Sequence, residues 1–188
     1  MKSILFFIKK MILLKKLKRL KSIGDHCDIQ IDIKLSFPER IILSDYIYIG
    51  PNANLNGLGG IEINKGTIIG PNVFIHSANH RYKNAKYLPY DETQDFKKVT
   101  IGENVWIGGN VSITPGTSIG EGCIIGMGTV VSGTIPPLSI VIGNPCQIVS
   151  QRNSGHYYDL KKNDKIYLSV KFNSQIKPDY YSGFNNSP

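Results

Sequence analysis

Long apolar runs and paired cysteines are both missing from this chain of 188 residues. The longest apolar run is the five residues ILFFI at 4–8, whereas a signal-peptide core needs about 7–15 apolar residues and a membrane span about 18 or more. We therefore expect neither a secretory signal nor a transmembrane helix. The three cysteines, Cys27, Cys123 and Cys146, are widely spaced and odd in number, which is typical of a reduced, cytosolic interior rather than a disulfide framework.

Acidic residues are missing from the first 21 positions. This segment holds eight basic residues, which equals the whole formal net charge of +8. Outside it, 14 basic residues (22 less 8) are balanced by 14 acidic ones. The body of the protein therefore lacks the basic excess that nucleic-acid binding requires, and no nucleic-acid partner is expected.

Residues 1–21 have the spacing of a helix. Ile4, Phe7, Met11, Leu14 and Leu17 recur every three or four positions, which predicts a short amphipathic helix with a lysine-rich face. Three roles stay open for it. Its apolar side can cap the main domain, it can lie on an anionic membrane surface, or the segment can be a disordered tail.

A repeat of six residues runs through the rest of the chain. Its clearest stretch is IGENVW–IGGNVS–ITPGTS–IGEGCI–IGMGTV–VSGTIP, starting at Ile101, and Ile63, Ile69 and Ile75 share the spacing. A weaker stretch begins at Ile23. The aliphatic positions of the main stretch are Ile101, Ile107, Ile113, Ile119, Ile125 and Val131.

A period of six is neither helical nor a plain alternation of two. It indicates one inward aliphatic residue per short strand, followed by a turn in which glycine lets successive coils approach closely. Three such hexads make one triangular coil, and stacked coils bury an Ile/Val column. The sequence therefore predicts an all-β solenoid.

Residues 99–149, VTIGENVWIGGNVSITPGTSIGEGCIIGMGTVVSGTIPPLSIVIGNPCQIV, resemble the C-terminal half of the galactoside, maltose and nodulation-type sugar O-acetyltransferases. These enzymes belong to the hexapeptide-repeat acyltransferases, and the resemblance covers roughly 45–150. It implies a left-handed parallel β-helix, acetyl-CoA as donor, no required metal, and homotrimers with active sites between subunits. The expected organisation is a basic helix over 1–21, the β-helix domain over 22–150 and a C-terminal tail over 151–188.

The hexad register breaks once. Ile75 and Ile101 are 26 positions apart, two more than a multiple of six, and the intervening stretch is polar and aromatic without a repeat. We expect a protruding loop over about 77–98, and long loops inside compact domains are usually functional. The resemblance implies that this loop reaches a neighbouring subunit and walls the active site.

His80, in VFIHSANH, matches the position of the family's catalytic base. Histidine suits the task because its ordinary pKa lies near neutral pH. His76 directly follows the inward Ile75, so it is expected on the outer side of the coil. A zinc site like that of the γ-class carbonic anhydrases is the competing interpretation, but neither His26 nor His156 supplies the third ligand nearby in the repeat.

The other site residues are implied by the resemblance. Asn54, Asn79 and Trp106 are candidates for acceptor binding, and Trp106 can equally pack against a neighbouring subunit. Three loop acids can orient His80 or bind sugar, or be merely solvated, and Cys123 is expected in the core. The acids are Asp91, Glu92 and Asp95.

The donor groove is implied along the C-terminal coils. The backbone N–H of Gly109 would hold the oxyanion, and Gly126, Met127 and Ser132 would meet the pantetheine arm. A lysine common in the family is replaced by Gly133, so Arg152 is the candidate for the CoA phosphates.

The expected function is transfer of acetyl from acetyl-CoA to a sugar hydroxyl, for instance on a cell-surface polysaccharide or its precursor. Other acceptors (an amino sugar, serine or an antibiotic hydroxyl) and a non-catalytic β-helix protein are the alternatives. The expected location is cytoplasmic and peripheral to the inner face of the membrane, with contact through residues 1–21.

Overall fold

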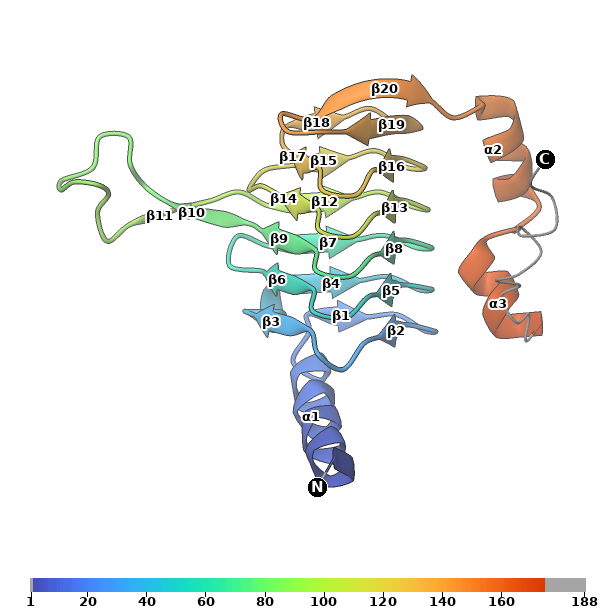
Figure 1. Ribbon diagram of the computed structural model, residues 1–188, viewed down its shortest axis with the longest axis horizontal. Coiled ribbons are helices and arrows are strands. Elements are labelled where there is room, and N and C mark those ends of the chain that lie inside the picture. Colours follow the sequence, from blue (N-terminus) through green and yellow to red (C-terminus); the bar gives the residue numbers. More distant parts are fainter. Residues whose placement is uncertain (1, 175–188) are drawn as a thin grey trace.

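The computed structural model describes residues 2–174, which form a parallel β-solenoid with helices at both ends of the chain (Figure 1). Three sheets make the three faces of the coil. The first face contains β1 (Ser22–Ile23), β4 (Ile41–Leu43), β7 (Ile61–Ile63), β12 (Val99–Ile101), β15 (Ser118–Ile119) and β18 (Thr134–Ile135). The second contains β2 (Asp28–Ile29), β5 (Tyr48–Ile49), β8 (Ile68–Ile69), β13 (Trp106–Ile107), β16 (Ile124–Ile125), β19 (Ser139–Ile142) and the antiparallel β20 (Gln147–Gln151). The third contains β3 (Lys34–Ser36), β6 (Asn54–Asn56), β9 (Phe74–His76), β14 (Ser112–Ile113) and β17 (Val130–Val131).

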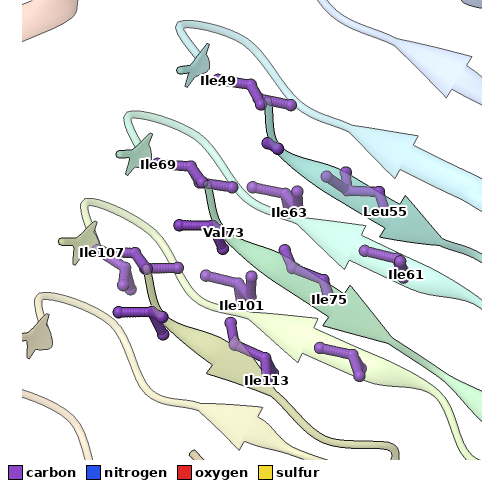
Figure 2. Close-up of a cluster of buried hydrophobic side chains, with 14 of the residues drawn as sticks. Ile49, Leu55, Ile61, Ile63, Ile69, Val73, Ile75, Ile101, Ile107 and Ile113 are labelled. Carbon is purple, nitrogen blue, oxygen red and sulfur yellow. The ribbon is translucent and has the colours of Figure 1, made fainter. Parts of the chain in front are cut away.

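The predicted inward positions do form the core. Ile49, Ile69, Ile107 and Ile125 pair in register from coil to coil on the second face, and all four are at most 1% exposed. Figure 2 shows Ile49, Ile69 and Ile107 stacked from coil to coil in the core. The six hexad positions from Ile101 to Val131 are all buried, so the solenoid prediction is confirmed.

Glycine allows the coils to stack at the corner that follows each second-face strand. A Cβ on Gly50 would lie 2.8 Å from the carbonyl carbon of Gly70, and one on Gly70 would lie 2.8 Å from that of Gly108. Real Cβ contacts are not that short, so any side chain there would push successive coils apart. The glycines of the repeat are therefore required by the spacing of the coils.

The N-terminal helix α1 (Lys2–Leu17) caps the first coil with its C-terminal half and projects away from the stack with the other half (Figure 1). Leu13 is buried, and Leu17 and Leu20 pack against the core. Of the five residues of the predicted apolar face, only Leu17 contacts the core. The other four, Ile4, Phe7, Met11 and Leu14, are exposed.

The described part of the C-terminal tail is helical, which the sequence did not predict. Helices α2 (Ser154–Lys162) and α3 (Tyr167–Ser174) lie beside the second face (Figure 1). Lys161 fastens α2 to the solenoid through Glu121 and Glu103, the latter at 2.9 Å. These two carboxylates, Glu121 first, hold the pKa of Lys161 above its usual range. Residues 175–188 lie outside the described part.

Candidate active site

The predicted loop leaves the third face directly after β9 and returns at β12 (Figure 1). Its base is a short antiparallel ladder between β10 (Ala78–His80) and β11 (Gln94–Phe96), in which His80 pairs with Gln94. The buried Ser77 fixes the exit, because its hydroxyl donates to the Asn56 carbonyl oxygen at 2.8 Å and accepts from the Gly59 N–H at 2.9 Å. The loop is thus anchored to the coil immediately beside His80.

His80 is exposed at the end of β10, and its ring stacks on Tyr90 with 4.0 Å between centroids and 17° between planes. The side-chain oxygen of Asn79 accepts a hydrogen bond from the His80 N–H at 3.0 Å. Stacking covers one face of the imidazole, and neither ring nitrogen makes a hydrogen bond to a described residue. The residue can therefore exchange a proton with a molecule in front of it.

The cavity beside His80 has a volume of about 250 Å³. Its lining is mostly polar and charged, and includes Asn79, Lys83, Asp95 and Lys97. Part of the wall comes from the following coil, at Thr114 and Pro115. Hydroxyl-rich ligands suit such a lining because many donors and acceptors converge on one volume.

The loop acids divide into one buried carboxylate and two surface ones. Asp91 is 6% exposed, so the solvated interpretation is wrong for this residue. Its carboxylate accepts hydrogen bonds from the hydroxyl and N–H of Thr93 and from the N–H of Lys86, which hold its pKa below the ordinary value of 3.8. Glu92 pairs with Lys86, and Asp95 pairs with Arg81 at 3.0 Å.

His76 ends β9 and is half-buried, on the opposite side of the strand from the fully buried Ile75. It lines none of the cavity that contains His80. Within residues 2–174, no group of three or more His, Cys, Asp or Glu side chains is placed to hold a metal ion.

A second cavity of about 420 Å³ lies along the second face. It brings together four of the predicted residues, Trp106, Gly109, Gly126 and Met127. The indole of Trp106 and the Met127 side chain are exposed. The Gly109 N–H donates no backbone hydrogen bond within the described residues, so it is available to an oxygen in this cavity.

The two cavities share no lining residue. His80 belongs to the loop after the third face, whereas Gly109 follows β13 on the second face. One chain thus presents a polar half-site and a largely apolar half-site at different places on its surface.

Comparison with known proteins identifies the family of this fold. The model of the bacterial transferase hexapeptide (six repeats) matches residues 98–133. The Escherichia coli (strain K12) protein WcaF, assigned to colanic acid biosynthesis as an acetyltransferase, is 27% identical over 69% of each chain. A hexapeptide-repeat-containing acetyltransferase from Vibrio cholerae O1 biovar eltor, complexed with acetyl coenzyme A, is 25% identical over 74% of this chain and 75% of that one, with a TM-score of 0.68.

A maltose O-acetyltransferase from Clostridium difficile 630 is 31% identical to this chain. The match covers 74% of this chain and 73% of the other, with a TM-score of 0.59. This chain belongs to the hexapeptide-repeat acyltransferases. The fold, the repeat and the loop of this acyltransferase all agree with the expectation drawn from residues 99–149.

Three of the residues predicted for the active site of this hexapeptide-repeat acyltransferase line neither of the two cavities. Asn54 begins β6 and pairs with Phe74 at the far end of the strand from His76. Ser132 is exposed in the turn after β17. The guanidinium of Arg152 donates to the Gly122 carbonyl oxygen at 3.1 Å and lies 5.0 Å from the centre of the Tyr157 ring, so in this chain it holds α2.

Cys123 is fully buried in this hexapeptide-repeat acyltransferase, as expected of a core residue. Its thiol donates to the Pro136 carbonyl oxygen at 3.0 Å, and desolvation raises its pKa. A buried thiol with a raised pKa is a poor nucleophile. The core assignment is confirmed.

Proposed function

We propose that this protein transfers acetyl from acetyl-CoA to the hydroxyl of a sugar. The observation that carries the proposal is His80, an exposed histidine on a loop anchored beside a polar cavity of about 250 Å³. The relatives support the substrates, because they include the maltose O-acetyltransferase, WcaF, and a galactoside acetyltransferase in complex with coenzyme A. A cell-surface polysaccharide or its precursor is the acceptor class that we favour.

The chemistry follows from one base and one hydrogen-bond donor. Neutral His80 removes the proton of the sugar hydroxyl, and the oxygen attacks the thioester carbonyl carbon of acetyl-CoA. The negative charge that develops on the carbonyl oxygen is stabilised by the Gly109 N–H. Collapse of this intermediate breaks the C–S bond, and the imidazolium of His80 returns its proton to the departing thiolate. No acyl-enzyme forms, and the products are the acetyl ester and free CoA.

This mechanism requires two subunits for each site. His80 and Gly109 line separate cavities within one chain, and both cavities open to the surface at exposed side chains such as Met127. We propose a homotrimer in which the loop of one subunit reaches the Gly109 face of the next, because a closed ring built from one heterologous interface satisfies every site.

The central test is a thiol-release assay with acetyl-CoA and a panel of mono- and oligosaccharides that includes amino sugars. His80→Ala should lower turnover at least about a hundredfold, since that is the usual contribution of a general base. His76→Ala is the matched control and should stay within a few-fold of wild type. Unchanged turnover of His80→Ala would show that the base is assigned wrongly.

Sharing of the site can be tested with mixed oligomers. Gly109→Val should block the donor cavity, because a Cβ there meets only Pro71, at 3.3 Å, while the rest of the side chain fills the cavity. His80→Ala and Gly109→Val should each be inactive alone. Mixed and reassembled in equal amounts, they should recover about a quarter of wild-type activity, because about a quarter of the interfaces join two intact half-sites. Absence of recovery would place both residues in a site within one subunit.

The cellular location is part of the same proposal. Among residues 2–174 no helix is long and apolar enough to cross a membrane. We place the enzyme in the cytoplasm, peripheral to the inner face of the membrane, where lipid-linked precursors of surface glycans are presented. The basic segment 1–21 supports this location because anionic lipids attract clustered lysines.

A further inference from the structure

The stretch Ile4–Ile8, which follows Lys2 and Ser3 at the start of α1, is apolar on every side. The five consecutive residues Ile4 to Ile8 are between 48% and 67% exposed. Because successive residues of a helix are 100° apart, five in a row surround the axis completely. This differs from the one-sided apolar face that the spacing predicts. We call residues Ile4–Ile8 the tip of α1, and the N-terminal part of this helix projects away from the first coil (Figure 1).

Cations follow directly behind the tip. Lys9 is paired with Asp32 at 2.7 Å, whereas Lys10, Lys15 and Lys18 are exposed and make no ion pair with any described residue. No acidic residue occurs in the chain before Asp25. In α1 the apolar tip is therefore followed by exposed lysines, Lys10, Lys15 and Lys18, that have no ion-pair partner among the described residues.

The C-terminal half of α1 is held against the body of the protein. Leu13 is buried, and Ile12, Leu13 and Lys16 line a groove together with residues Ile31 to Ile33 of the first coil. Since the solenoid occupies that side, a flat membrane cannot approach the whole length of the helix from it. The tip is the part of α1 that is open in all directions.

We propose that the tip enters the interfacial region of an anionic lipid bilayer at a tilt, so that the start of α1 at Lys2 stays at the surface and Lys10, Lys15 and Lys18 face the phosphate head groups. Five residues of helix span about 7 Å, and interfacial helices bury their apolar parts about 5–10 Å deep. This inference gives a partner and a mode of contact to the proposed inner-membrane location, and it rests on that location rather than on the chemistry of His80.

The charge pattern favours lipid over a second copy of the chain. Tips that packed together would bring Lys10 and the other cations without an ion-pair partner, Lys15 and Lys18, of every copy close to one another, and like charges at close range repel. An anionic bilayer offers an apolar interior for the tip and a negatively charged surface for Lys10, Lys15 and Lys18.

Sedimentation of the full chain with vesicles tests the proposal. We expect binding to an equal mixture of phosphatidylglycerol and phosphatidylcholine and little binding to phosphatidylcholine alone. Each of Lys10→Gln, Lys15→Gln and Lys18→Gln should weaken binding about fivefold, which corresponds to about 1 kcal/mol per basic residue at such a surface. The double change Phe6→Ser/Phe7→Ser should weaken it at least about tenfold through the lost apolar contact.

Two substitutions elsewhere on the surface are matched controls. Lys162→Gln removes one charge from α2, and Leu88→Ser removes an apolar side chain that is 98% exposed in the loop. Neither should change vesicle binding. Equal binding to both vesicle types, or no effect of Phe6→Ser/Phe7→Ser, would overturn the proposal. So would dissociation of the oligomer by that double change in light scattering, because the tips would then bind one another.

The outcome is separable from that of the proposed function. Thiol release with a soluble sugar acceptor needs no vesicles, so Phe6→Ser/Phe7→Ser should keep wild-type turnover in that assay. A protein that turns over normally but does not bind anionic vesicles would refute only the membrane contact. A protein that binds vesicles but transfers no acetyl group would refute only the proposed reaction.

Discussion

The solenoid and the loop of residues 77–98 differ in almost every property that holds a structure together. In the solenoid, aliphatic side chains such as Ile75 and Ile101 are fully buried and each coil is paired with the next. In the loop, Tyr87, Leu88 and Tyr90 are exposed and a three-residue ladder forms the base. The comparison teaches that the repeat provides rigidity, whereas the candidate base His80 sits on a segment that departs from the repeat and is anchored beside the core.

The largest expected effect contrasts the two regions in stability. Ile75→Ala, at the last inward position before the loop, should reduce the free energy of unfolding by about 2–5 kcal/mol because it removes buried methyl groups and leaves a cavity. Leu88→Ala should change the same quantity by no more than about 0.5 kcal/mol, since that side chain is 98% exposed. Denaturant unfolding followed by far-ultraviolet circular dichroism measures both. Similar losses for the two variants would mean that the loop contributes to the fold as the solenoid does.

A smaller effect concerns turnover and the stack of His80 on Tyr90. We assign Tyr90 as a positioning residue, because its ring covers one face of the imidazole at 4.0 Å. An aromatic pair contributes about 0.5–1.5 kcal/mol, so Tyr90→Ala should lower kcat about 2- to 12-fold. The KM for acetyl-CoA should not change, because Tyr90 lies apart from the donor cavity.

Two neighbouring variants sharpen this second prediction. Tyr90→Phe keeps the ring and should keep kcat near wild type. Tyr87→Ala removes an exposed tyrosine of the same loop that makes no ring contact within the described residues, and it should have no effect. If Tyr90→Phe were as slow as Tyr90→Ala, the phenolic hydroxyl rather than the stack would matter.

The solenoid could be predicted from the sequence because each hexad repeats the same physical requirement. Ile101, Ile107 and Ile113 are buried where a period of six places them, and the break between Ile75 and Ile101 marks the loop. Position in a repeat determines both the direction of a side chain and its partner in the next coil. His80 was assigned through the resemblance of VFIHSANH to the family's catalytic-base motif, and its role as the base stays a prediction.

Contacts that do not follow the register could not be predicted. Asp91 is buried because Thr93 and Lys86 fold around its carboxylate, and Leu13 rather than Ile4 meets the core because of the angle at which α1 leaves the first coil. No spacing in the sequence encodes either arrangement. The packing of Arg152 on Tyr157 of α2 is a further contact of this kind, and its role in binding the CoA phosphates stays a prediction.

The smallest expected effect is local and depends on pH. The hydrogen bonds from Thr93 hold the pKa of Asp91 below 3.8, so their contribution to loop order is complete above that value and is lost as the pH falls through the lowered pKa. Pepsin cleavage within residues 81–93 should therefore stay slow from about pH 5 to about pH 4 and accelerate only below that range. Asp91→Asn should be cleaved several-fold faster from about pH 5 to about pH 4, because an amide cannot accept from three donors as a carboxylate does, and the difference from wild type should shrink at lower pH. Glu92→Gln, next to it but exposed, should follow wild type. If Asp91→Asn had the wild-type profile, the carboxylate would not be what orders the loop around His80.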